Sequence, residues 1–244
     1  MARVRIRFAK LGKIRWTSHR DTARMWERAF RRVGLPLAYT NGFSPRPKVS
    51  FGLALPTGHE SVAEYLDLEL TGGVPLDVSS LPAELSGALP VGVDALAAAV
   101  IDDRAPSLQE DVTSCTWSLV VAPVESTTSA AVDLDILVAQ VLEAATVVVS
   151  RQRKGTEVTD DIRPAILSLC VCDETTDGTR LECELATKPR SLRSSELVAA
   201  LAPGLEERHV RRLHQWIERD GARWEPLPAP AAATSAPHAL ERAS

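Results

Sequence analysis

Residues 2–10 read ARVRIRFAK, and apolar and basic side chains alternate along them. Successive side chains of a β-strand point to opposite faces, so this alternation predicts a strand with one buried and one polar face. The buried face is expected to carry Val4, Ile6 and Phe8, and the polar face Arg3, Arg5 and Arg7.

The following segments predict a repeating order of helices and strands. Between Ser18 and Gly34 apolar residues recur at helical spacing; Ser18 with Asp21 resembles a capping box, and Gly34 is a stop signal. Residues 35–40, 61–70 and 91–101 predict strands, and residues 76–90 a short helix. Strand, helix, strand, strand, helix, strand is the order of a split βαβ, ferredoxin-like unit.

The second half repeats this order after a polar linker over residues 102–111. Strands are expected at 113–123, 146–155, 164–174 and 179–188, helices at 129–145 and 193–204, and either a strand or a helix at 207–218. The predicted fold class is therefore α+β, with two tandem ferredoxin-like domains. The boundaries are 1–104 for a basic first domain, 112–225 for the second, and 226–244 for a disordered Pro/Ala-rich tail.

Basic residues are concentrated at the start of the chain. The net charge is −4, yet residues 1–50 hold thirteen Lys and Arg against two acids, which is 13 − 2 = +11, and the rest carries 15 − 30 = −15. A local excess of cations attracts polyanions whatever the overall charge is.

Composition also excludes several classes of protein. The apolar runs are too short for a membrane span and no secretion signal is visible, so we expect a cytoplasmic protein. The four cysteines lack metal-ligand spacing, and Cys170 and Cys172 would lie on one face of a strand, so we predict no metal and no cofactor. P-loop and dinucleotide-binding motifs are also absent.

The cations define a predicted nucleic-acid site. Arginines two apart on a strand are spaced by roughly 7 Å per step, so Arg3, Arg5 and Arg7 are expected to form a ladder for phosphates. In the loop 40–52, two prolines would present Arg46 and Lys48 in an extended backbone beside an aromatic ring. The predicted nucleic-acid-binding residues are Arg3, Arg5, Arg7, Arg15, Arg20, Arg24, Arg28, Phe43, Arg46, Lys48, Arg153 and Lys154.

Each part of this site has a structural alternative. The arginine ladder would instead dock on acids of the second domain, the helical cations would form a solvated face, and the loop would be a rigid crossover. Arg153 and Lys154 belong either to a second phosphate-binding turn or to a charged loop held by internal ion pairs.

Two histidines are weak catalytic candidates. His19 at the start of the predicted helix and His59 in PTGHES lie close in sequence to the basic segments. A histidine beside arginines is able to act as general acid or base on a ribose 2′-hydroxyl without a metal. A histidine at a helix start also serves as a cap or a surface residue, and both interpretations stay open.

Five short motifs lie between residues 3 and 70. They are F-x-K-x-G at Phe8, Lys10 and Gly12; R-x-x-S-H-x-D at Arg15, Ser18, His19 and Asp21; R-R-x-x-L-P at 31–36; G-F-S-P-x-P-K at 42–48; and G-x-E-S-x-x-E-Y at 58–65. This stretch resembles the radical-SAM-linked protein family, a bacterial domain of unknown function, in its stand-alone form. KGTEVTDDIRP at 154–164 resembles the second block of that family. The resemblance implies a radical SAM enzyme as a partner, whereas the chain itself lacks the C-x-x-x-C-x-x-C motif that would hold an iron–sulfur cluster.

These observations lead to a first hypothesis and two alternatives. The first is an RNA-binding accessory module that presents tRNA or rRNA to a modifying, radical-SAM-type partner, with no catalysis of its own and no contact with a membrane. The alternatives are a metal-independent endoribonuclease of tandem ferredoxin-like architecture and a protein adaptor that docks an acidic partner.

Overall fold

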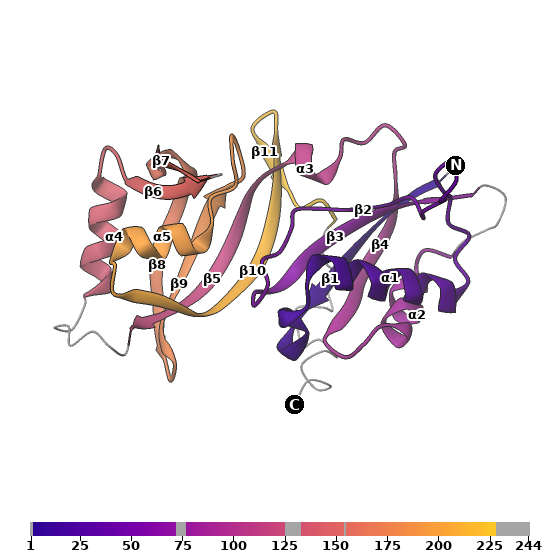
Figure 1. Ribbon diagram of the computed structural model, residues 1–244, viewed down its shortest axis with the longest axis horizontal. Helices are drawn as coiled ribbons and strands as arrows, with labels where there is room; N and C mark the ends of the chain where they lie inside the picture. Colours follow the sequence, from indigo (N-terminus) through magenta and orange to yellow (C-terminus); the bar gives the residue numbers. More distant parts are fainter. Residues whose placement is uncertain (1, 72–76, 125–132, 154, 228–244) are drawn as a thin grey trace. The chain divides into compact units, whose positions relative to one another are not determined.

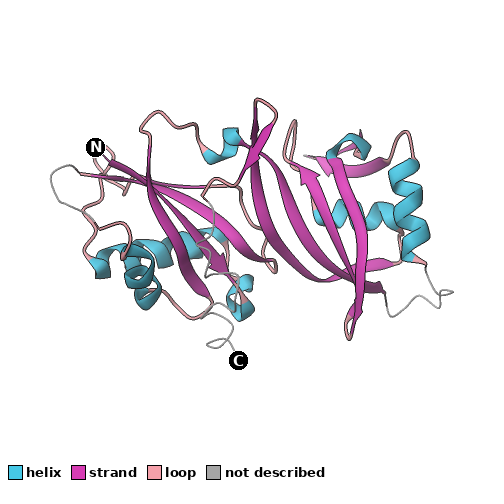
Figure 2. Ribbon diagram, turned by 180° about the vertical axis from the view of Figure 1, so that it is seen from behind, coloured by secondary structure: helices cyan, strands magenta, loops and turns pink. Residues whose placement is uncertain are grey.

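A computed structural model describes residues 2–71, 77–124, 133–153 and 155–227 (Figure 1). The fold class is α+β, because strands predominate and helices are few (Figure 2). The contacts divide the chain into unit 1, Met1–Val112 with Gln215–Ser244, and unit 2, Thr113–His214. Residues from Gln215 onward thus belong to unit 1, whereas the sequence predicts a second domain that extends to residue 225. The predicted tail begins with the described Pro226 and Leu227, and its remainder lies outside the described residues.

Unit 1 is built around strand β1, which lies between β3 and β4 and is antiparallel to both. The short β2 pairs antiparallel with β3, and the end of β10 (Leu205–Arg219) pairs with β11. The elements of unit 1 are β1 Ala2–Lys10, the 3₁₀ helix η1 Gly12–Trp16, α1 His19–Val33, β2 Val49–Phe51, β3 Glu60–Leu70, α2 Leu81–Ala88, β4 Val93–Ile101, α3 Leu108–Asp111 and β11 Ala222–Trp224.

The core of unit 1 lies between this sheet and helices α1 and α2. Val4, Ile6 and Phe8 of β1 pack with Trp26 and Phe30 of α1, as their sequence pattern predicts. The Phe8 and Trp26 rings meet edge to face with centroids 4.9 Å apart. Figure 1 shows both helices along the same side of the strands.

The strand expected at residues 35–40 is absent. Leu37 and Tyr39 form only isolated bridges, and the strand of this region, β2, lies further on, at Val49–Phe51, where it pairs with β3. Pro36 has no N–H to donate to a ladder, which disfavours a strand at this position. The predicted linker contains α3, which begins with a capping box between Ser107 and Glu110.

Unit 2 contains β5, β9 and β8 as successive antiparallel neighbours, with β10 on the other side of β5. The strand expected at 146–155 pairs only with the strand after it, as a separate two-stranded sheet. The undecided segment 207–218 is part of a strand. The elements are β5 Val112–Pro123, α4 Leu134–Glu143, β6 Val148–Arg153, β7 Thr156–Asp161, η2 Arg163–Ala165, β8 Ile166–Thr175, β9 Gly178–Ala186, α5 Ser194–Leu201 and β10 Leu205–Arg219.

Candidate nucleic-acid interface

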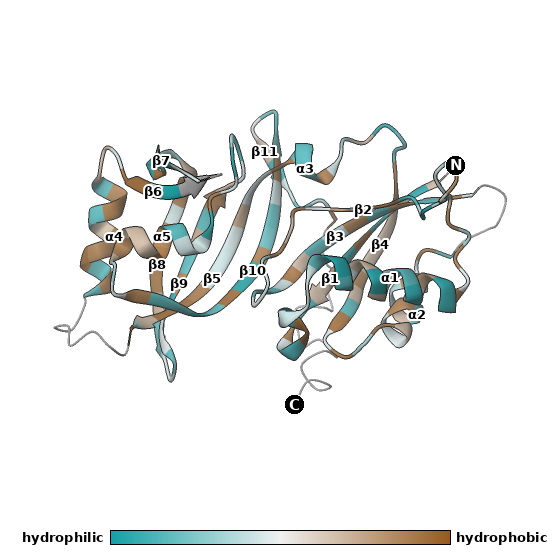
Figure 3. Ribbon diagram, viewed as in Figure 1, coloured by the Kyte–Doolittle hydropathy of each residue, from teal (hydrophilic) through white to brown (hydrophobic). Residues whose placement is uncertain are grey.

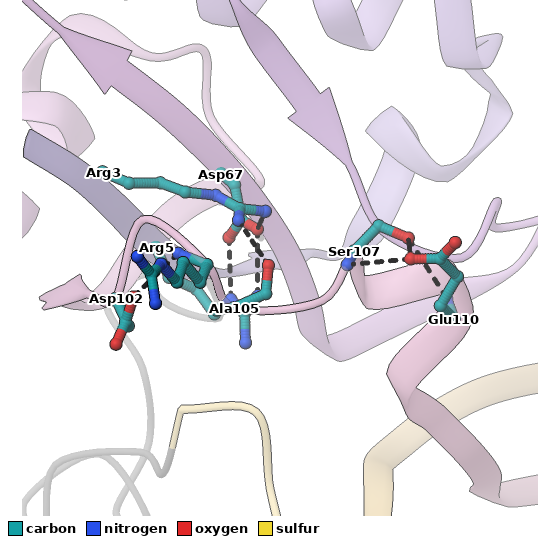
Figure 4. A network of polar contacts seen from close by, with 8 residues as sticks. Arg3, Arg5, Asp67, Asp102, Ala105, Ser107 and Glu110 are labelled. Carbon is teal, nitrogen blue, oxygen red and sulfur yellow. Dashed lines mark hydrogen bonds and ion pairs between the residues drawn. The ribbon is translucent and has the colours of Figure 1, made fainter. Parts of the chain in front are cut away.

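The arginine ladder of β1 lies in the interior and is paired with acids. Arg5 is 4% exposed, and its guanidinium donates to both carboxylate oxygens of Asp67 at 2.7 and 2.9 Å. Arg5 and Asp67 are direct partners in the β1–β3 register (Figure 4). Arg3 donates to the same carboxylate at 2.7 Å and to the Ala105 carbonyl at 2.6 Å.

Arg7 is equally enclosed. Its Nη1 donates to the Glu225 carboxylate at 2.5 Å, and its guanidinium lies 5.8 Å from the centroid of the Tyr65 ring. The prediction that Arg5 and Arg7 present their charges to phosphate is therefore wrong. Their acidic partners come from β3 and from residue 225, both of unit 1, and not from the second unit.

The outer face of α1 carries the exposed cations. Arg20, Arg24, Arg28 and Arg31 are exposed, while Thr22, Trp26, Ala29 and Phe30 point into the core. Helix α1 begins at the Ser18 cap, whose hydroxyl accepts from the Asp21 amide at 3.2 Å, and ends at Gly34 in the left-handed region. Figure 3 shows much of α1 in the hydrophilic colour.

Two of these arginines are not neutralised. The side chains of Arg20 and Arg28 form no hydrogen bond or ion pair with any residue that the structure describes. Arg24 contacts Asp21 at 3.4 Å, and both side chains are more than half exposed, so this pair is weak. Residues four apart in a helix are separated by about 6 Å along its axis. Arg20, Arg24 and Arg28 therefore form a regular row of positive charge.

The loop before β2 contributes one further cation and one ring. Two backbone hydrogen bonds between residues 38–40 and 46–48 close this loop. Arg46 is exposed with no side-chain partner in the described chain, and Phe43 is fully exposed. Lys48, by contrast, donates to Glu69 at 2.7 Å, so its charge is largely compensated.

The charged block of unit 2 is held by internal ion pairs. Arg151 of β6 contacts Asp160 of β7 at 2.7 Å, and Arg190 contacts the same carboxylate at 3.1 Å. The hydrogen bond from Arg151 lowers the pKa of Asp160. Arg153 ends β6, but its side chain is outside the part that the structure describes, as is the whole of Lys154.

His19 lies at a small pocket beside the start of α1. Lys10, Glu64 and the Phe8 and Phe51 rings also line this pocket, whose cavity volume is about 20 Å³. The rings of His19 and Phe51 meet edge to face at 5.2 Å. Burial lowers the pKa of the Lys10 amine, and the Glu64 carboxylate partly opposes this effect. An amine, a carboxylate and an imidazole around one cavity are groups able to transfer protons.

The other histidine lies apart from this pocket. His59 is half-buried and does not line it. Within the described ranges, no group of three or more His, Cys, Asp or Glu side chains is placed to hold a metal ion. None of the helices in those ranges is both long and apolar enough to cross a membrane.

Sequence reasoning missed Trp16. Its side chain is 64% exposed at the end of η1, with the Arg15 guanidinium 5.4 Å from its ring centroid. Arg15, a predicted binding residue, is partly exposed and contacts Glu60 at 3.4 Å. This five-residue turn is too short to show a periodic pattern of apolar residues, so the exposure of Trp16 could not be predicted from the sequence.

Comparison with known proteins gives a family. No curated protein matches the sequence of this chain. Among solved structures, the chain is similar to one titled "Crystal Structure of a Cbf5-Nop10-Gar1 Complex", with 11% identity and a TM-score of 0.49. The likeness covers 87% of this chain, which spans 48% of the other. A family model described as "Uncharacterized protein conserved in bacteria (DUF2344)" matches residues 3–200. The chain therefore belongs to this family of uncharacterized bacterial proteins.

Proposed function

We propose that this chain is an RNA-binding accessory module of the bacterial cytoplasm, which presents tRNA or rRNA to a modifying enzyme. The observation that carries the proposal is the row of exposed arginines on α1, in which Arg20 and Arg28 have no partner in the described chain. Unpaired cations on a helix bind phosphates by releasing counterions, without any requirement for base sequence. A radical SAM enzyme as the partner rests on the sequence motifs alone.

The proposal also includes the fold of each unit. Each unit is a ferredoxin-like sandwich, and two observations support this. Unit 1 has the strand order β4-β1-β3 with β2 on the far side of β3, and unit 2 has the order β10-β5-β9-β8. Both match a split βαβ unit, with β6 and β7 inserted in the second.

The experiment measures the affinity of the full chain for fluorescein-labelled tRNA and rRNA fragments by anisotropy over a series of salt concentrations. Arg28→Glu is compared with Arg104→Glu, because both arginines are exposed and neither side chain has a partner in the described chain. Each substitution changes the net charge by the same amount, so only the position differs.

We expect Arg28→Glu to weaken binding at least several-fold and Arg104→Glu to leave it almost unchanged. Loss of one phosphate contact lowers the slope of log K against log salt by about 0.7–0.9. The triple variant Arg20→Glu, Arg28→Glu, Arg46→Glu should abolish binding. Equal binding by the triple variant and the natural chain would eliminate the proposal.

A second candidate function is a metal-independent endoribonuclease. The observation in its favour is that His19 shares a pocket with Lys10 and Glu64, and that Arg20 and Arg24 follow it within the first two turns of the same helix. The test incubates cellular RNA with the chain in the presence of EDTA. Products that form with the natural chain and disappear with His19→Ala would favour this function, and intact RNA in both reactions would eliminate it.

A further inference from the structure

The turn that presents Trp16 is fixed from beneath by two buried charges. The Lys10 amine, 3% exposed, donates to the Thr17 carbonyl at 2.9 Å and more weakly to that of Arg15 at 3.4 Å. The buried Glu60 carboxylate accepts from the Gly12 amide at 2.7 Å. The two groups thus hold the backbone before and after Trp16, and their hydrogen bonds offset part of the cost of burying the charges.

The ring itself is also held in place. A Cβ atom at Gly58 would lie 2.9 Å from Cζ3 of Trp16, so the ring packs against the glycine backbone. Gly58 has a φ of +90° and donates from its amide to the Arg15 carbonyl at 2.9 Å. The indole is therefore supported along one side while most of its surface stays open.

The cations near the Trp16 ring indicate which kind of ligand would bind there. Of the four cations between residues 10 and 20, Lys10 is bonded to the backbone of the turn and Arg15 contacts Glu60, which leaves Lys13 and Arg20. Lys13 is exposed without a side-chain partner in the described chain, and Arg20 begins the exposed row of α1. A rigid aromatic ring beside unpaired cations is the combination on which single-stranded nucleic acid binds, with a base stacked on the ring and phosphates on the cations.

We propose that Trp16 is a stacking platform for an unpaired nucleobase of RNA. This inference rests on the proposed RNA-binding function and adds to it that the bound RNA is single-stranded at this point. The preformed turn reduces the conformational entropy lost on binding.

The test titrates the full chain with three probes: an eight-nucleotide single-stranded RNA, an abasic strand of the same length, and a duplex of the same sequence. Trp16→Ala is compared with Trp16→Phe, which keeps a smaller ring. Anisotropy gives the affinities, and tryptophan fluorescence reports stacking. Urea unfolding of both variants checks that the fold is retained.

Stacking of one base is worth about 1–3 kcal/mol, so Trp16→Ala should weaken binding of the single strand roughly 5- to 150-fold. Trp16→Ala should bind the abasic strand and the duplex as tightly as the natural chain does, and Trp16→Phe should retain most of the affinity for the single strand. Of the three probes, only the single strand should quench the tryptophan fluorescence of the natural chain.

Four results would overturn the inference. If the natural chain binds the single strand and Trp16→Ala binds it equally well, the platform is wrong while the proposed function stands. An equal loss for single and abasic strands would mean that Trp16 does not stack on a base. Loss of a co-purifying protein in Trp16→Ala, with unchanged RNA affinity, would make Trp16 a protein contact. If the natural chain binds labelled tRNA but none of the three probes, the platform is wrong while the proposed function stands.

Discussion

Substitution of Asp67 by alanine should destabilise unit 1 strongly, because this carboxylate neutralises a buried arginine. The change removes both bonds to Arg5, of 2.7 and 2.9 Å, and leaves its guanidinium without an acid in a position that is 4% exposed. Arg3 loses one bond of 2.7 Å but keeps its bond to the Ala105 carbonyl, and its side chain is 17% exposed. The cost therefore falls mainly on Arg5.

Removal of one partner from a buried ion pair costs about 3–5 kcal/mol. At a shift of about 2–4 °C per kcal/mol for a protein of this size, the melting temperature should fall by roughly 6–20 °C. The double variant Arg5→Met, Asp67→Leu removes both charges and fills the space with apolar side chains. It should recover most of the lost stability, because a buried pair contributes little beyond an apolar replacement.

The free energy of unfolding is measured by urea titration followed by circular dichroism, for the natural chain and the single and double variants. Charge reversal at the exposed Arg28 serves as the control and should change stability by no more than about 0.5 kcal/mol. A loss below about 1 kcal/mol in Asp67→Ala would be that of a surface pair and would refute the burial of Arg5. A double variant that is no more stable than Asp67→Ala would also refute the burial of Arg5.

Three further predictions concern local stability. Ser18→Ala removes the cap of α1, whose hydroxyl accepts a first-turn amide at 3.2 Å, and should cost about 1 kcal/mol in urea unfolding; an unchanged midpoint would contradict this. Gly87→Ala in α2 should raise the free energy of unfolding by about 0.4–1 kcal/mol, because no atom lies within 4 Å of the added Cβ. Gly92→Ala should lower it by more than that, because Gly92 has a φ of +90° and its Cβ would meet a backbone carbonyl. Similar melting temperatures for the two variants would refute the contrast. The hydrogen bond from Arg151 lowers the pKa of Asp160 from its ordinary 3.8, so this carboxylate stabilises the fold above that pH and the gain disappears as the pH falls through the lower, folded value. The melting temperature of Asp160→Asn should therefore lie below that of the natural chain at pH 7, and the difference should shrink as the pH falls below 3.8; a constant difference would be inconsistent with the linkage.

Local sequence signals predicted the elements that depend on local interactions. In α1, the Ser18 cap and the Gly34 stop are confirmed, and apolar residues at the predicted helical spacing are buried. The strand predicted at 35–40 is wrong because strand propensity does not specify which segment reaches the edge of β3. That choice depends on the register between Phe51 and Leu66, which local pattern does not encode.

The candidate site was predicted only in part, because burial of a charge depends on distant partners. Arg5 and Arg28 look equivalent in sequence, since each is a cation opposite an apolar face. Asp67 is 62 residues from Arg5, and Glu225 is 218 residues from Arg7, so neither pairing follows from the local pattern. The exposed face of α1 was predictable, because helical periodicity alone assigns its arginines to the side away from the core.

The motif residues divide into two groups by exposure, and this division bears on which of them carry function. Lys10 and Glu60 are charged, belong to the quoted motifs and are buried. Lys10 bonds to the Thr17 carbonyl, and Glu60 to the Gly12 amide and the Arg15 side chain, all within or next to the η1 turn. Their charges therefore do not by themselves indicate catalysis, since the same residues are needed to build the turn. The surface that this turn creates consists of Trp16 and its neighbouring cations, which have no comparable role in the core. The functional residues are therefore expected among the exposed residues that the motifs position. Comparison of the RNA affinities of Trp16→Ala and Arg28→Glu separates base stacking from phosphate binding at this surface.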